Sequence, residues 1–382
     1  MNFLAPHTPK DKIQTSHKGS LLNMKFLCKD MCHIKGFKTS CGNPDFYKHS
    51  TKAIENAPFL QKILNEGAIL EGITICDEFF YSIIGENIHY GTPINKNAPN
   101  CVPGGSSSGS AAALTQIDYD FTIGTDTGGS VRVPASFCGV FGFRPTHGRI
   151  NLQKVYPMSE SFDTLGWFSN DKSNMLKLGK IFFDNFREIQ IEQKNILIPI
   201  DIVDDLDHNI KSQFYNYCEY KFKNLKKVQL SSYKKSELAD CFRVIQGYEI
   251  KLNILPWIEK YNPKISTEIN SRFKMAKNIT KNMYDDAVNL RKEFISELDQ
   301  NLPVESILIF PTTPFSAPIK GQSDDDLSEL RKKVMEFTCI GGLSSRPQIS
   351  IPKFKGSTGP IGLSVLGNKY ADEIILNNIN LF

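Results

Sequence analysis

Hydrophobic and polar residues follow one another along the chain in blocks that suit short buried strands and amphipathic helices. In the N-terminal part, this pattern predicts a strand over Leu21–Cys28, a helix over Thr51–Asn65 that is closed by Gly67, and a second strand over Ala68–Thr74. Short apolar strands that alternate with helices are typical of α/β proteins.

The same pattern returns late in the chain. Five apolar residues recur at helical spacing between positions 283 and 298, and the run SILIF at Ser306–Phe310 then predicts a buried strand that ends at Pro311. Together these elements predict a mostly parallel sheet that is covered by helices on both faces. The five residues are Met283, Ala287, Leu290, Phe294 and Leu298.

Composition adds limits to this picture. The chain has 382 residues, 40% of them hydrophobic and 23% charged, which suits a single globular domain over residues 1–382. A net charge of +4 with scattered lysines argues against nucleic acid as a partner. The chain has nine cysteines without paired spacing, and its start lacks the apolar stretch of a secretory signal. It also has no apolar run long enough to span a membrane, so we expect a cytoplasmic protein without membrane contact. The spacing of Cys28, Cys32, His33 and Cys41 matches no common zinc pattern, so we expect no metal.

Two segments rich in glycine and serine carry the candidate chemistry. The first is PGGSSSGSAAAL at Pro103–Leu114, which runs from glycines and serines directly into helix-forming residues, unlike a flexible linker. Ser108 or Ser110 is therefore expected to cap a helix. The second is GTDTGGSVRVPASFCG at residues 124–139, where another glycine pair precedes a serine.

Two general motifs fit the first segment poorly. A phosphate-binding P-loop would need a Gly-Lys-Ser/Thr ending, which does not follow these glycines. The residues Gly105–Gly109 satisfy the G-x-S-x-G elbow of serine hydrolases, but the elbow requires a preceding strand, and NKNAPNCVP is polar and broken by proline. His147 and His208, the later histidines, have no distinctive setting for a Ser-His-Asp triad.

The stretches GGSSSGSAAAL and FTIGTDTGGSVRVPASFCGVFGFRPTHG resemble the core signature of the amidase signature family of hydrolases. The resemblance also includes FLCKD, GAILEGITICDEFFYSIIGENIHYGTPIN, LIFPTTPFSAP and PQISIPKFKGSTGPIGLSVLGNKYADEIIL, and is nearest to compact plant-type amidases that act on indole-3-acetamide. It implies an α/β fold with a large mixed, mostly parallel sheet. We expect a signature core over about 20–150, a variable substrate-pocket region over about 171–303, and C-terminal strands and a helix over 304–382.

The resemblance implies a Ser-Ser-Lys catalytic set. Ser130 falls on the nucleophile, Ser106 on a bridging serine held after a cis peptide bond, and Lys29 on the general base. A lysine accepts a proton only when it is neutral, so Lys29 should be buried, with its pKa lowered from about 10.4 towards about 7–8. Ser106 could then pass the proton of Ser130 to Lys29 and return it to the leaving amine.

Neighbouring positions are implied to support this set. Asp126 and Arg132 either brace the nucleophile loop through hydrogen bonds or form an ordinary ion pair. Ser107 is expected to be a supporting hydrogen-bond partner. The implied oxyanion hole consists of backbone N–H groups at Thr127, Gly128, Gly129 and Ser130.

The implied activity is hydrolysis of a small carboxylic amide to acid and ammonia, with no metal or organic cofactor. The run SVRVPASFCGVFGF favours aryl or alkyl acetamides as substrates, provided that Phe137, Phe141 and Phe143 line the pocket rather than the core. Two alternatives stay open: the A subunit of an aminoacyl-tRNA amidotransferase, and a non-catalytic receptor-like protein. The oligomeric state also stays open.

Overall fold

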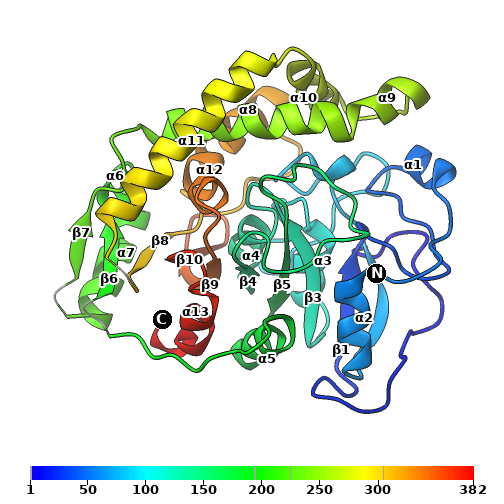
Figure 1. Ribbon diagram of the computed structural model, residues 1–382, viewed down its shortest axis with the longest axis horizontal. Helices are drawn as coiled ribbons and strands as arrows, with labels where there is room; N and C mark the ends of the chain where they lie inside the picture. Colours follow the sequence, from blue (N-terminus) through cyan, green and yellow to red (C-terminus); the bar gives the residue numbers. More distant parts are fainter. Residues whose placement is uncertain (1, 193–194, 224, 304) are drawn as a thin grey trace.

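The computed structural model describes residues 2–192, 195–223, 225–303 and 305–382. Ten strands form one sheet in the order β2-β1-β3-β5-β4-β9-β10-β8-β6-β7 (Figure 1). The strands are β1 (Lys25–Lys29), β2 (Ile69–Thr74), β3 (Phe121–Asp126), β4 (Phe141–Arg144), β5 (Thr164–Ser169), β6 (Ile196–Pro199), β7 (Lys226–Val228), β8 (Ile307–Pro311), β9 (Gln348–Lys355) and β10 (Pro360–Gly367). The helices are α1 (Pro44–His49), α2 (Pro58–Asn65), η1 (Glu78–Phe80), α3 (Ser108–Leu114), α4 (Arg132–Cys138), α5 (Lys172–Phe182), α6 (Ile200–Val203), α7 (His208–Lys221), α8 (Lys235–Asn253), α9 (Leu255–Tyr261), α10 (Thr267–Lys277), α11 (Lys281–Asn301), α12 (Asp324–Leu343), α13 (Asp372–Asn377) and η3 (Ile379–Leu381).

The elements predicted from the hydrophobic pattern are present, with one shortened strand and one shortened helix. The strands β2 and β8 and the long helix α11 lie where the pattern predicts them, whereas β1 begins only at Lys25, because residues 21–23 form a turn ahead of the predicted strand. The helix expected over Thr51–Asn65 begins only at Pro58, because proline is favoured in the first helical turn. Upstream of it, Ala53 instead exchanges backbone hydrogen bonds with Gly36 and Phe37.

The mixed sheet is parallel only at its two ends. The pairs β2–β1, β1–β3, β8–β6 and β6–β7 are parallel, whereas every pair from β3 through β5, β4, β9 and β10 to β8 is antiparallel. The expectation of a mostly parallel sheet is therefore wrong for the middle of the sheet. One reason is the short connection between β9 and β10, residues 356–359, because so short a turn can join only antiparallel neighbours.

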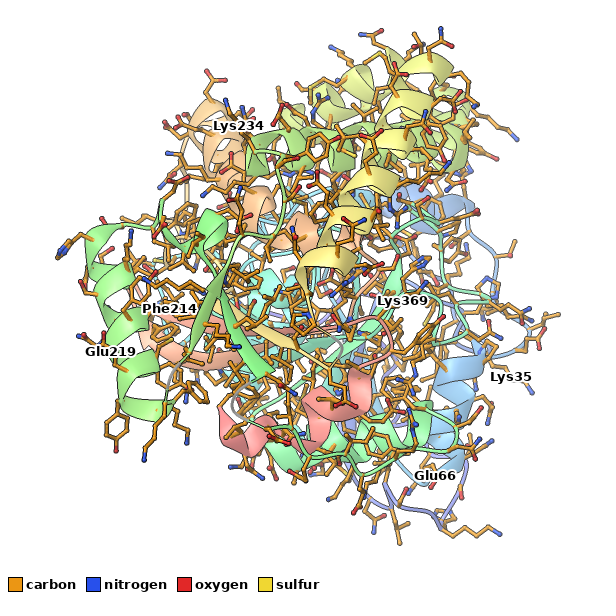
Figure 2. The ribbon with its side chains drawn as sticks, turned by 60° about the vertical axis from the view of Figure 1, so that its left-hand side comes forward. Lys35, Glu66, Phe214, Glu219, Lys234 and Lys369 are labelled. Atoms are coloured by element: carbon orange, nitrogen blue, oxygen red, sulfur yellow. The ribbon has the colours of Figure 1, made fainter. Side chains whose placement is uncertain are left out.

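Helices cover both faces of the sheet, as predicted. On β5, Trp167 packs against Phe182 and Phe183 at the end of α5, whereas the next residue, Phe168, packs in a cluster with residues of α3 and α4. Successive strand residues point to opposite faces, so α5 lies on one face and α3 with α4 on the other. Helix α7 packs on β9 through the buried Phe214, with Glu219 on its exposed side (Figure 2).

An outer group of helices lies beside this sandwich. Helices α9, α10 and α11 pack on α8, and α8 packs on α12. In Figure 1 this group, coloured green to yellow, extends along one side of the molecule, above α12. It is formed by residues of the segment that resembles known amidases least, and it faces the ends of the strands that carry the site.

Candidate active site

Lys29 is the last residue of β1 and is fully buried. Its Nζ donates hydrogen bonds to Oγ of Ser106 at 2.8 Å and to Oγ1 of Thr125 at 2.9 Å, and lies 4.7 Å from the centre of the Phe80 ring. Burial lowers the pKa of Lys29, although nearby acidic groups, among them Asp77, act in the opposite direction. The burial expected from the sequence is observed, and it acts on the Lys29 pKa in the expected direction.

Ser106 follows a cis peptide bond with Gly105, the geometry that the resemblance implied. The next residue, Ser107, connects this segment to the nucleophile loop: its N–H donates to the carbonyl oxygen of Ser130 at 3.3 Å, and its Oγ donates to the carbonyl oxygen of Thr125 at 3.2 Å. Ser107 thus makes the supporting contacts expected of it. The structure therefore brings Lys29, Ser106 and the backbone of Ser130 to one place.

The predicted helix cap is wrong. Helix α3 begins at Ser108, and the residue at its N-cap position is Ser107, whose side chain caps no backbone N–H. Ser108 and Ser110 instead donate to the carbonyl oxygens of Ile75 and Ile123, at 3.5 Å and 3.0 Å. The start of this helix is buried against neighbouring strands, so its hydroxyl groups bind strand carbonyls rather than their own helix.

Asp126 organises the nucleophile loop between β3 and α4. Its carboxylate accepts backbone N–H groups of Gly129 and Val131, both at 3.0 Å, and binds Nε and Nη2 of Arg132 at 3.0 Å and 2.7 Å. Arg144 adds a third cationic contact at 3.0 Å. Burial alone would raise the pKa of Asp126, but the two arginines hold it below its usual range. Asp126 and Arg132 therefore form an ion pair that also braces the loop.

The implied oxyanion hole needs one correction. The N–H of Gly129 already donates to Asp126, so it is engaged within the protein. The N–H groups of Thr127, Gly128 and Ser130 make no hydrogen bond within the described residues and are available to a substrate oxygen. The loop is held from outside by Thr338 of α12, whose Oγ1 donates to the carbonyl oxygen of Gly128 at 2.6 Å.

A cleft of about 560 Å³ lies between α8, α10 and α12, and two of the residues that line it approach this loop. A Cβ atom on Gly128 would lie 3.0 Å from Cε of Met335 and 3.1 Å from the ring of Phe242, and both residues line the cleft. Tyr81, next to the Phe80 that covers Lys29, lines it too. Sequence reasoning missed these residues, because on an amphipathic helix a cleft residue looks like a core residue.

The phenylalanines after Ser130 belong to the core. Phe137 and Phe143 are fully buried, and Phe141 packs against the same core; none of the three lines the cleft. The apolar pocket wall inferred from SVRVPASFCGVFGF is therefore wrong, since α4 and β4 turn these rings into the sheet sandwich. The apolar lining comes from α8 and α12 instead.

Two buried carboxyl groups near the site also escaped the sequence analysis. Asp77 accepts the N–H of Gly85 at 3.0 Å, and its own N–H donates to the carbonyl oxygen of Ser106 at 3.2 Å. Asp163 accepts the hydroxyl of Thr127 at 2.6 Å. Burial raises the pKa of each carboxyl to about 6. Neither residue stands out in its local sequence.

Other chemistry finds less support in the described residues. No three His, Cys, Asp or Glu side chains there are grouped to hold a metal ion, and no helix there is long and apolar enough to cross a bilayer. His147 contacts the carbonyl oxygen of Glu160 at 2.8 Å, whereas the hydroxyl of Ser107, the central serine of the G-x-S-x-G pattern, donates to the carbonyl oxygen of Thr125 at 3.2 Å, and no strand directly precedes it in the described chain. The serine-hydrolase elbow is therefore contradicted by the structure.

Comparisons with known proteins identify the family of this chain. The profile of the Amidase family matches residues 5–196. The chain is 33% identical to Amidase 1 of Arabidopsis thaliana, over 99% of this chain and 96% of the relative, and 34% identical to Amidase 1 of Oryza sativa subsp. japonica, over 98% and 92%. A solved structure described as that of an amidase superposes with a TM-score of 0.84 at 24% identity, covering 94% of this chain and 84% of the other, and shows the same fold. The chain thus belongs to the amidase signature family and is a hydrolase that acts on amide carbon–nitrogen bonds.

Proposed function

We propose that this amidase acts without partner subunits on small carboxylic amides, in particular aryl or alkyl acetamides such as indole-3-acetamide, by a Ser-Ser-Lys acyl-enzyme mechanism. The observation that carries the mechanism is the 2.8 Å contact between Nζ of the buried Lys29 and Oγ of Ser106. It supports a base held in its neutral form and directed at the serine adjacent to the nucleophile loop. The apolar cleft residues Phe242 and Met335 support an apolar acyl group.

In the proposed reaction, Oγ of Ser130 attacks the amide carbonyl carbon while its proton passes by way of Ser106 to Nζ of Lys29. The carbonyl electron pair moves to oxygen, which the free N–H groups of the loop stabilise. The intermediate collapses, the carbon–nitrogen bond breaks, and the proton returns through Ser106 to the departing ammonia. Water then attacks the acyl-enzyme, Lys29 again takes and returns a proton, and the acid leaves with Ser130 regenerated.

The experiment measures ammonia released by the purified chain alone from indole-3-acetamide, phenylacetamide, glutamine and asparagine. We expect turnover of the aryl amides, loss of nearly all turnover in Ser130→Ala and Lys29→Ala, and residual activity in Ser106→Ala. Lys25→Ala is the matched control, because Lys25 is the exposed first residue of the same strand.

Three results would contradict the proposal. Near wild-type turnover in Ser130→Ala would exclude the nucleophile. Activity confined to glutamine that appears only with added partner subunits would favour an amidotransferase A subunit. Absence of turnover with every amide would favour a binding role.

A further inference from the structure

Arg331 of α12 lines the cleft without a partner of its own. Within the described residues it makes no hydrogen bond or ion pair; its guanidinium carbon lies 5.6 Å from the centre of the Tyr81 ring, and its Nε is buried and unbonded. A buried donor without an acceptor costs about 1–3 kcal/mol, and more when it is charged, so such groups usually have a use. The ring of Phe80, the residue before Tyr81, covers Lys29. Because Arg331 lies over the Tyr81 ring, it lies on the side of the cleft nearest Lys29.

The carboxylate of Glu268, which also lines the cleft, already has a cationic partner. Arg272 of α10 forms an ion pair with Glu268 of the same helix and donates to the carbonyl oxygen of Tyr81. Burial, together with the positive charge of Arg331, lowers the pKa of Arg272. Two cations therefore lie close together at this end of the cleft, and only one of them has a carboxylate partner.

The other acidic residues that line the cleft do not compensate Arg331. Asp240 pairs with Arg243 at 3.1 Å, and Glu329 pairs with Lys333 at 3.0 Å. Asp324 and Asp325 form the exposed first turn of α12, where solvent screens them. Burial lowers the pKa of Arg331, and the negative charge of Asp77 acts against this shift, but the two side chains form no ion pair within the described residues.

We propose that Arg331 is a specificity-determining residue, and that it binds a carboxylate at the far end of the acyl group of the substrate. The preferred substrates are then amides with an apolar body, packed against Phe242 and Met335, and a terminal carboxylate. A guanidinium presents paired N–H groups that match the two oxygens of a carboxylate, which a lysine cannot reproduce. This inference rests on the proposed amidase function and narrows its substrates.

The test compares three substrates: phenylacetamide, its 4-acetyl derivative, which carries a neutral acceptor, and its 4-carboxy derivative. For the wild type we expect kcat/KM to be highest for the carboxylate, by about tenfold over phenylacetamide, because hydrogen bonds between two charged groups are stronger than those to a neutral group. Arg331→Gln should abolish this preference, measured as the ratio of kcat/KM for the carboxylate to kcat/KM for phenylacetamide within each variant, and Arg331→Lys should retain only part of it. Arg243→Gln, which changes a paired arginine of the same cleft, is the control and should keep the preference.

The outcomes separate the two proposals. Turnover of phenylacetamide without any preference for the carboxylate, or a preference that survives in Arg331→Gln, would overturn the role of Arg331 alone. Equal rates for the acetyl and carboxy substrates would show that a neutral acceptor suffices, and would also overturn it. If no amide is hydrolysed, the proposed function fails, and calorimetry with 4-carboxyphenylacetate still tests Arg331: binding by the wild type and at least tenfold weaker binding by Arg331→Gln would support it, and equal or absent binding would refute it.

Discussion

Gly105 has no room for a side chain, so we expect Gly105→Ala to displace Ser106 and lower the catalytic rate. A Cβ on Gly105 would lie 2.1 Å from Oδ2 and 2.7 Å from Cγ of Asp77. Non-bonded carbon atoms pack at roughly 3.5–4.0 Å, so Gly105→Ala must move these groups apart by about 1 Å. Asp77 is buried and bonded to Gly85 and Ser106, so part of the shift falls on Ser106. Misplacement by 1 Å costs about 100-fold in rate, or about 2.7 kcal/mol in the activation barrier.

The assay is kcat for phenylacetamide in Gly105→Ala, with circular dichroism and the thermal midpoint as checks of folding. Combining Gly105→Ala with Asp77→Ala removes the clashing carboxyl group and should recover part of the loss, which a double-mutant cycle measures. Gly247→Ala in α8 is the control, because its Cβ would meet only the mobile Cδ1 of Ile279. A folded Gly105→Ala enzyme with kcat within twofold of wild type would refute the reasoning.

Three further predictions concern charges around the site. The ascending limb of kcat/KM against pH should report a pKa below that of an ordinary lysine. Asp77→Asn removes a negative charge that raises the pKa of Lys29, so this limb should move to lower pH. An unchanged limb would contradict the assignment of Lys29 as the base. Because burial raises the pKa of Asp163 to about 6, its contribution to stability should be complete below about pH 4 and lost as pH rises towards 6. Urea unfolding at pH 4.5 and 7 should therefore show a difference that is smaller in Asp163→Asn than in the wild type by about 2 kcal/mol, and an equal difference would contradict the assignment. Arg132→Lys cannot reproduce the contacts of the guanidinium with Asp126, Thr338 and Gln348, so the thermal midpoint and kcat should fall together, and loss of neither would show that the ion pair is dispensable.

The part of the site that could be read from the sequence is the part encoded in short contiguous segments. Residues 103–132 contain a tight turn, a helix start and a glycine-rich loop, and it is the resemblance of these contiguous segments to the family signature that identified Ser106 and Ser130. Lys29 was identified through the family resemblance of FLCKD, and its burial was expected because a lysine accepts a proton only when it is neutral; the structure places it, buried, at the end of β1. The engagement of the Gly129 N–H by Asp126 was not predictable, since composition does not say which donor a carboxylate takes.

The cleft could not be read in the same way because it is assembled from distant helices. Phe242, Arg272 and Arg331 lie on α8, α10 and α12, and their sequence spacing is that of ordinary amphipathic helices. Nothing local distinguishes a side chain that faces a cleft from one that faces the core. The antiparallel middle of the sheet escaped prediction for a related reason, since strand direction depends on which strands become neighbours, whereas periodicity reports only that a strand is buried.

Helix α12 connects the proposed carboxylate site to the proposed nucleophile loop. One turn of it carries Met335 and Thr338, the first a cleft residue and the second the donor that holds the carbonyl group of Gly128. One turn earlier, Arg331 reaches the cleft, and Arg132 anchors the helix to the nucleophile loop through the carbonyl oxygen of Thr338 at 2.6 Å. If Arg331 binds a carboxylate as proposed, the ligand contacts the same helix that holds the proposed oxyanion loop, so binding energy gained far from the amide can help to position that loop for catalysis.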